Sequence, residues 1–187
     1  MHAVLIRHAE HALQDQVLVG RSPGVHLTTR GLNHARAIGC SLGREHIARV
    51  QSSPSERCVE TAEEIAAIVG VPVEIESALD EIDVGAWTGA TFTNLENDPD
   101  WRAWNELRSL VRPPGGESMQ QAQQRIVRHL LETAKCTRAS RVAMVTHAEI
   151  IRAAMLHARR LPLDSWNSIA IAPGEIVPLT VVEDVAA

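Results

Sequence analysis

The stretch MHAVLIRH (residues 1–8) places an arginine and a histidine directly after a short apolar run. The run at 3–6 has the length and continuity of a buried strand. In open α/β sheets, ligands bind where a strand ends and the chain turns toward a helix. A guanidinium can bind phosphate through two hydrogen bonds, and an imidazole can form a covalent intermediate. Arg7 and His8 therefore predict a reactive site at the end of the first strand.

The bulk composition indicates one ordinary globular domain. The chain has 187 residues, of which 45% are hydrophobic and 22% charged, and its formal net charge is −5. We therefore expect a single domain over 1–187, and no binding of nucleic acid, which needs a basic surface. The apolar run at the N-terminus is too short for a signal peptide, and nothing approaches the ~20 apolar residues of a membrane span. Three widely spaced cysteines favour a reducing, cytoplasmic location.

Strand-like and helix-like segments alternate along the chain. Strong apolar runs predict strands at 3–6, 47–50 and 141–145, and weaker runs predict strands at 73–75, 169–171 and 176–182. The spacing of apolar residues predicts helices over about 28–42, 55–69, 117–135 and 149–157. This order is typical of an α/β fold, here a three-layer αβα sandwich with a mostly parallel central sheet. The irregular segment at about 88–114 is expected to form a small helical cap that influences substrate specificity.

Polar residues follow each of the three strong strands. Arg7 and His8 follow the first, the run SSPSER (52–57) follows the second, and His147 follows the third. Because the carboxyl ends of parallel strands open on one side of a sheet, Arg7, His8, Arg57 and His147 should meet in one crevice. A helix N-terminus at the same place would favour anions through its free N–H groups. The sequence thus predicts a phosphate site.

Each of these residues has a simpler explanation when it is taken alone. A histidine after a strand can be structural, and Arg57 can be a solvated charge paired with Glu56. Glu81 can be one surface acid among several. All of them would have to fall at these positions by accident, however, so their joint arrangement favours a functional site.

Six motifs, in order, resemble those of the histidine phosphatase superfamily, the phosphoglycerate mutase-like fold. They are LIRHAE (5–10), HLTTRG (26–31), SSPSERCVETA (52–62), LDEIDVGAWTG (79–89), PPGGES (113–118) and VAMVTHAEIIRA (142–153). The resemblance covers residues 3 to about 155. It implies a nucleophile at His8, a phosphate clamp of Arg7, Arg57 and His147, and a general acid at Glu81.

The chemistry of phosphoryl transfer is consistent with these roles. The reaction requires positioning and neutralisation of the charge on three phosphoryl oxygens, which Arg7, Arg57 and His147 can provide without a metal or cofactor. His8 must attack as a neutral imidazole, and neighbouring arginines disfavour its protonation. Glu81 must first protonate the leaving group and then activate water. We therefore expect metal-independent hydrolysis of a phosphomonoester through phosphohistidine.

Several positions depart from the residues usual in this family, among them Val84, which replaces a phenylalanine. Ala9 replaces a glycine, Gln14 replaces an asparagine that contacts phosphate, and Ala148 and Glu149 replace a Gly-Gly pair. We expect Gln14, Ala148 and Glu149 to contact the substrate, although Glu149 places a negative charge near an anionic site. Arg21 is a candidate for binding a second anionic group.

Three alternative functions stay open at this point. A phosphoglycerate mutase-like phosphomutase shares the catalytic motifs, but it carries longer insertions than the compact segment at 88–114. A catalytically silent phospholigand-binding module would result if Ala9 and Glu149 abolished turnover. A metallohydrolase would use His8 and His11, with Glu10 and Asp15 nearby, but ligands at such spacing should lie on a helix, whereas this stretch leads from a strand into a loop.

The expected partner is a small phosphorylated substrate, with no nucleic acid and no membrane. Phosphosugars, nucleotides, phosphoproteins and cofactor precursors all remain open as its class. The strand at 176–182 would lie at a sheet edge or in an interface, so a homodimer is one expectation.

Overall fold

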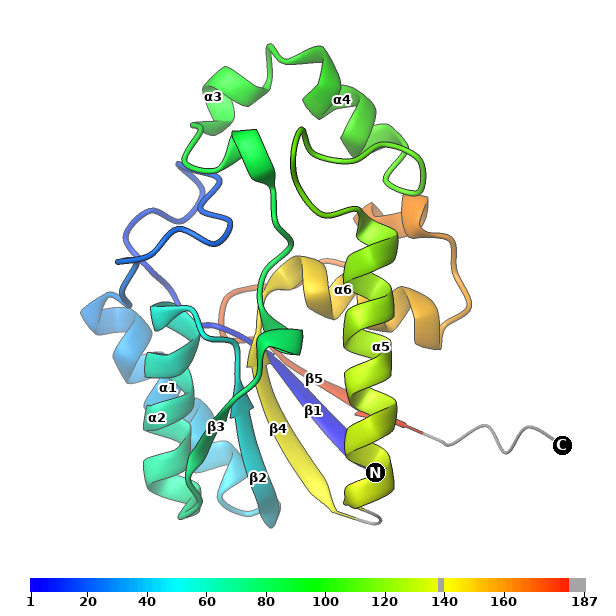
Figure 1. Ribbon diagram of the computed structural model, residues 1–187. Coiled ribbons are helices and arrows are strands. Elements are labelled where there is room, and N and C mark those ends of the chain that lie inside the picture. The colour runs from blue at the N-terminus through cyan, green and yellow to red at the C-terminus, as the bar shows by residue number, and fades with distance from the viewer. Residues whose placement is uncertain (138–139, 182–187) are drawn as a thin grey trace, which may run out of the picture.

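The computed structural model describes residues 1–137 and 140–181, and its centre is a five-stranded sheet in the order β3-β2-β4-β1-β5 (Figure 1). The strands are β1 (His2–Arg7), β2 (Ile47–Ser52), β3 (Val73–Ile75), β4 (Arg141–Thr146) and β5 (Ile176–Thr180). β1, β2, β3 and β4 run parallel, whereas β5 is antiparallel to β1 and forms an edge of the sheet. The predicted α/β fold with a mostly parallel sheet is confirmed.

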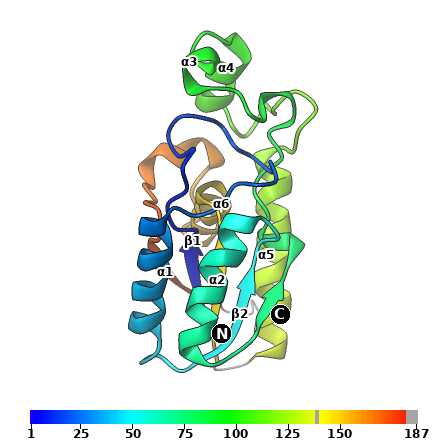
Figure 2. The ribbon, with the colours of Figure 1, turned by 90° about the vertical axis from the view of Figure 1, so that its left-hand side faces the viewer.

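Helices cover both faces of the sheet, as the side view in Figure 2 shows. α1 (Thr29–Leu42) and α2 (Glu56–Val69) lie on one face, and α5 (Met119–Cys136) and α6 (Ala148–Ala158) lie on the other. Alternate residues of a strand point to opposite faces. Accordingly, Val4 and Ile6 of β1 join the apolar cluster of α1 and α2, while Leu5 joins that of α5 and α6. Burial on both faces explains the continuous apolar run of β1.

Local sequence signals set the limits of the helices. α1 begins after Thr28, whose side chain accepts a hydrogen bond from the backbone N–H of Gly31. α5 begins with a capping box formed by Ser118 and Gln121. α2 ends at Gly70, which has a φ of 79° and so adopts the left-handed conformation that glycine accepts readily. None of the described helices combines the length and apolar character that a membrane span needs.

The predicted strand at 169–171 is wrong. The chain there runs from the short 3-10 helix η3 (Leu163–Ser168) to β5 without joining the sheet. The carbonyl of Ile169 accepts a hydrogen bond from Arg152, and that of Ile171 accepts one from Arg7. The guanidinium groups thus supply the hydrogen bonds that a neighbouring strand would otherwise donate. Ile169 and Ile171 are both buried, which explains why the run has the apolar sequence of a strand. Residue 182, at the end of the last predicted strand, lies outside the described residues.

The segment at 88–114 lies over the end of the sheet where β1 and β4 terminate (Figures 1 and 2). It contains α3 (Phe92–Leu95) and α4 (Pro99–Glu106) and follows the short 3-10 helix η2 (Gly85–Trp87); a further 3-10 helix, η1 (Ser77–Leu79), follows β3. The rings of Trp87, Trp101 and Trp104 pack against one another with centroids 5.2–5.8 Å apart. These tryptophans therefore form an apolar core for the segment.

Replacing Gly31 with alanine is expected to destabilise the fold. A Cβ at this position would lie 2.2 Å from the backbone oxygen of Glu10, which also accepts a hydrogen bond from the Thr28 N–H. Overpacking of this kind costs about 1–3 kcal/mol. Gly43→Ala is the matched control, because its Cβ would have no neighbour closer than 3.5 Å. Urea unfolding should show a clearly lower midpoint for Gly31→Ala, and equal midpoints would contradict the close contact.

Candidate active site

A cavity of about 330 Å³ opens at the carboxyl end of the parallel strands. One part of its wall holds Arg7, His8, Arg57 and Glu81. The part that we call the outer wall comes from the cap segment, α6 and η3. It consists of Phe92, Trp101, Trp104, Asn105, Arg108, Glu149, Arg152 and Trp166. Residues predicted from three separate strand ends thus converge on one site.

His8 follows β1 directly and is held in one tautomer. Its Nδ1 lies 2.9 Å from the carbonyl oxygen of Ala9. A carbonyl can only accept a hydrogen bond, so Nδ1 carries the proton and Nε2 keeps its lone pair. Burial, together with the positive charge of Arg57, holds the pKa of His8 well below its usual value of 6.5. His8 is therefore a neutral imidazole whose Nε2 can act as a nucleophile.

Arg57 and Arg7 bring hydrogen-bond donors that have no partner. Arg57, only 2% exposed, donates from one terminal nitrogen to the carbonyl of Gly20 at 2.8 Å and to Nδ1 of His147 at 3.1 Å. Its Nε and its other terminal nitrogen are buried without a partner, as is Nε of Arg7. In the described part of the chain, no carboxylate lies within ion-pair distance of either arginine. An anion with several oxygens would satisfy these donors.

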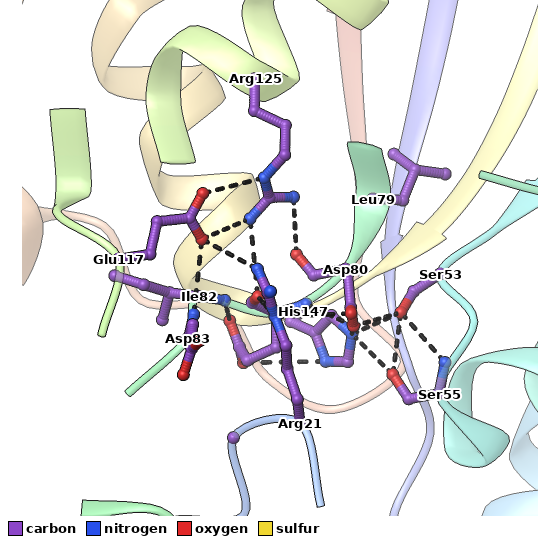
Figure 3. A network of polar contacts seen from close by, with 12 residues as sticks. Arg21, Ser53, Ser55, Leu79, Asp80, Ile82, Asp83, Glu117, Arg125 and His147 are labelled. Carbon is purple, nitrogen blue, oxygen red and sulfur yellow. Dashed lines mark hydrogen bonds and ion pairs between the residues drawn. The ribbon is translucent and has the colours of Figure 1, made fainter. Parts of the chain in front are cut away.

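His147 is the N-cap of α6 and is fully buried, and Figure 3 shows its ring beside Ser53 and Ser55. Because Arg57 donates to its Nδ1, the proton lies on Nε2, which is 2.9 Å from the hydroxyl of Ser53. Ser53 in turn donates to a carboxylate oxygen of Asp80 at 3.2 Å. The ring centroids of His147 and His8 are 5.4 Å apart. The cavity wall does not include His147, which instead reaches the site through its hydrogen bond with Arg57.

Two arginines, which Figure 3 shows beside Glu117, fix the backbone that carries Glu81. Arg21 donates to the carbonyl of Glu81 at 2.7 Å, and Arg125 donates to the carbonyl of Asp80 at 2.9 Å. Both arginines also bind the carboxylate of Glu117, at 3.0 and 2.8 Å. This network joins the loop after β1, the segment before α5 and the loop of Glu81, and so holds the backbone of Glu81 in place.

The environment of Glu81 suits proton transfer near neutral pH. Burial and the negative charge of Glu149 raise the pKa of Glu81 to about 7, although the charge of Arg57 opposes this shift. One carboxylate oxygen of Glu81 accepts a hydrogen bond from the Ile82 N–H, and the other lies 3.7 Å from Nδ1 of His147. Close to pH 7, Glu81 can therefore either donate or accept a proton.

The raised pKa of Glu81 predicts a cost in stability. The unfolded chain releases this proton near 4.5 and the folded chain near 7, so stability falls as the pH rises between these values. The full cost, about 3 kcal/mol, applies above the folded pKa. Through this group, wild type should therefore lose about 3 kcal/mol of unfolding free energy between pH 4 and pH 8. Glu81→Gln lacks the titrating carboxyl and should not show this loss. Urea unfolding of both proteins at both pH values measures this effect. A stability difference between variant and wild type that does not change with pH would contradict the prediction.

Of the four residues predicted to bind substrate, three lie on the cavity wall. Gln14, Ala148 and Glu149 line the cavity. Arg21 does not, because its guanidinium is occupied in the network around Glu81. Ala9 is fully buried outside the cavity wall and has no positive φ, so its methyl group neither faces the cavity nor strains the backbone.

The sequence analysis expected the cap segment and Glu149 at the site, but it did not anticipate how the charges of the outer wall pair with one another. Arg108 is 2% exposed, and its guanidinium carbon lies 3.8 Å from the ring centroid of Trp104 and 3.6 Å from that of Trp166. It forms an ion pair with Glu149, which also accepts a hydrogen bond from Arg152 at 2.6 Å. Arg108 lies just beyond the end of α4, so no helical spacing predicts its contact with Trp104. Their contact with Trp166 and Glu149 depends on the tertiary fold.

His11 is a second residue whose place in the site was not anticipated. It lines the cavity beside His8, with ring centroids 5.2 Å apart, and burial, with the charges of Arg57 and Arg7, lowers its pKa to about 4. The sequence suggested His11 only as part of a metal site. Among the described residues, no group of three or more His, Cys, Asp or Glu is arranged to hold a metal ion.

The fold and the site together define an α/β protein in which a neutral histidine lies beside two arginines with unpartnered buried donors. A family model described as the histidine phosphatase superfamily (branch 1) matches residues 3–186, and the chain belongs to this family. The resemblance inferred from the six motifs is thereby confirmed, as is the class of enzyme.

Similar proteins include both phosphatases and mutases. Phosphoserine phosphatase 1 of Hydrogenobacter thermophilus is 35% identical over 155 residues, which cover 80% of this chain and 72% of that protein. The probable phosphoglycerate mutase GpmB of Salmonella paratyphi C is 31% identical over 176 residues, 89% of this chain and 77% of that protein. The solved structure of Bacillus stearothermophilus YhfR has a TM-score of 0.89 at 25% identity, covering 97% of this chain and 92% of that one. Three mycobacterial relatives at 32% identity are longer, and this chain spans 45% of their length.

Proposed function

We propose that the protein is a metal-independent phosphomonoester hydrolase that forms a phosphohistidine at His8. The observation that carries this proposal is the fixed tautomer of His8, with Nε2 free beside two arginines that have unpartnered buried donors. Relatives named as phosphatases support the reaction class. The substrate would be a small phosphorylated metabolite that fits the cavity.

In the first step, Nε2 of His8 attacks the phosphorus atom and the bond to the alcohol oxygen breaks. Arg7 and Arg57 bind the phosphoryl oxygens and neutralise their charge, while His147 keeps Arg57 in place. Glu81, in its protonated form, donates its proton to the leaving oxygen. The products of this step are the free alcohol and phosphohistidine.

In the second step, water replaces the alcohol. The Glu81 carboxylate, left without its proton, accepts one from water, and the oxygen of that water attacks phosphorus. The bond between phosphorus and Nε2 breaks, which releases inorganic phosphate and restores neutral His8 and protonated Glu81. A pKa near 7 allows Glu81 to take both roles.

A phosphomutase is the second candidate, because GpmB is among the relatives. Both reactions form the same phosphohistidine and differ only in whether water or a phosphorylated acceptor takes up the phosphoryl group. We favour water, because the segment at 88–114 is compact and encloses a small cavity.

We also infer a cytoplasmic location, since Cys40, Cys58 and Cys136 are all free thiols in the structure. A homodimer stays a prediction, for which β5 at the sheet edge is the candidate surface.

Phosphate release from p-nitrophenyl phosphate in the presence and absence of EDTA tests the proposed reaction. We expect equal rates in both conditions. In a parallel assay, the protein should release phosphate from 3-phosphoglycerate or leave it unchanged, but it should not convert it to 2-phosphoglycerate. Loss of activity in EDTA would contradict the metal-independent mechanism, and isomerisation faster than phosphate release would establish the mutase.

A further inference from the structure

His11 differs from the other buried histidines in that its ring bonds no described residue. Four histidines are buried in the part of the chain that the structure describes, and they are His8, His11, His129 and His147. In each of the other three, a ring nitrogen lies 2.9 Å from an oxygen atom of the protein. Nδ1 of His11 is buried without a partner, and Nε2 bonds no described residue either. A hydrogen bond within the fold therefore does not explain why a histidine occupies this position.

The two ring nitrogens of His11 have different surroundings, which decides where the proton lies. Nδ1 is buried and has no acceptor, and a buried N–H without an acceptor is unfavourable. Nε2 is not among the buried atoms, and the ring lines the cavity beside His8, with the two ring centroids 5.2 Å apart. The proton therefore lies on Nε2, and His11 presents an N–H donor to the cavity.

This donor carries no charge near neutral pH. Burial and the positive charges of Arg57 and Arg7 lower the pKa of His11 to about 4, although the charge of Asp15 opposes this shift. The two guanidinium groups already match the two negative charges of a phosphomonoester. A neutral imidazole beside them adds a hydrogen-bond donor without adding a third cation that the arginines would repel.

We propose that His11 is a further catalytic residue, which donates a hydrogen bond from Nε2 to an oxygen of the phosphoryl group during its transfer. This inference rests on the proposed hydrolase function. A phosphoryl group in transfer spreads its charge over three oxygens, and donors that are fixed in advance stabilise that charge without reorganisation. The sequence predicted His147 as a member of the phosphate clamp, but the cavity wall holds His11 and does not include His147.

Two variants of His11 separate a hydrogen bond from a packing role. Glutamine can place an amide N–H close to the position of Nε2, whereas phenylalanine keeps a ring against His8 but has no donor. We expect His11→Gln to hydrolyse p-nitrophenyl phosphate within about tenfold of wild type, and His11→Phe to lose about 10²-fold in kcat/KM. The opposite order of activity would assign His11 to packing against His8 and would overturn the inference.

The loss in His11→Phe should not depend on the leaving group, because the proposed contact is with the phosphoryl oxygens. The fall in kcat/KM should therefore be equal for p-nitrophenyl phosphate and for glycerol 3-phosphate, whose alkoxide needs a proton to leave. A loss confined to glycerol 3-phosphate would place His11 at the leaving oxygen and contradict the proposed contact.

NMR spectroscopy of wild type with isotopically labelled histidine tests the contact without any substitution, and it decides the matter if both variants lose activity equally. Vanadate is the probe. We expect the Nε2 proton of His11 to become protected from exchange with solvent when vanadate binds, and this signal should be missing from His11→Gln. Ring signals of His11 that do not change at saturating vanadate would overturn the inference. If wild type hydrolyses no phosphomonoester, the proposed function fails and the inference with it, whereas hydrolysis with unchanged His11 signals refutes the inference alone.

Discussion

His8→Ala is expected to abolish phosphate release, with kcat lower by on the order of 10⁴-fold or more, because a covalent nucleophile and its partners act as a unit. In the part of the chain that the structure describes, no other group in the cavity combines a fixed lone pair with two arginines that keep unpartnered donors. Initial rates with p-nitrophenyl phosphate measure the effect. Vanadate should still bind the variant, since Arg7 and Arg57 are unchanged.

His157→Ala is the matched control for this prediction, because His157 is exposed on the last turn of α6 and should leave kcat unchanged. Residual activity of His8→Ala within tenfold of wild type would refute the nucleophile. A different result, in which wild type binds vanadate but turns over no phosphomonoester, would establish the phospholigand-binding module.

Glu81→Gln should have the second-largest effect, and its size should depend on the leaving group. For an alkyl phosphate, kcat/KM should fall by about 10²–10⁴-fold, because the alkoxide needs the proton that glutamine cannot supply. For p-nitrophenyl phosphate the fall should be smaller, because nitrophenolate leaves without protonation. An equal loss on both substrates would indicate a structural role for Glu81 instead of proton donation.

The pH dependence of the same reaction gives an independent check on Glu81. The free enzyme needs protonated Glu81 for the first step, so kcat/KM of wild type for an alkyl phosphate should decline above pH 7. Neutral His8 is required as well, but its low pKa keeps its titration below this range. Glu81→Gln should lose the alkaline decline. A decline that persists in the variant would assign it to another group.

The sequence predicts the sheet and the reactive end of the site because both depend on local patterns. The apolar run at 3–6 predicts a buried strand, and polar residues follow each of the three strong strands. Because parallel strands share one open edge, these positions predict that four side chains converge there: Arg7, His8, Arg57 and His147. The run at 169–171 carries the same apolar signal but lacks a strand to pair with, so its carbonyls bind arginines instead.

The rest of the site depends on contacts between segments that are distant in the sequence. Arg108 is buried because Trp166 and Glu149 meet it from η3 and α6, which no local pattern indicates. Arg21 was a candidate for binding a second anionic group, yet its guanidinium is taken by Glu117 and by the backbone of Glu81. Sequence reasoning could identify the charges of this region but not their pairing.

Trapping the phosphoenzyme tests the central claim most directly. Glu81→Gln should still attack p-nitrophenyl phosphate but should be slow to activate water, so the intermediate should accumulate. After quenching in alkali, where phosphohistidine is stable, mass spectrometry should find one added phosphoryl group per chain, attached to Nε2 of His8. A phosphoryl group on any other side chain, or continued phosphate release with no labelled protein, would contradict catalysis through His8.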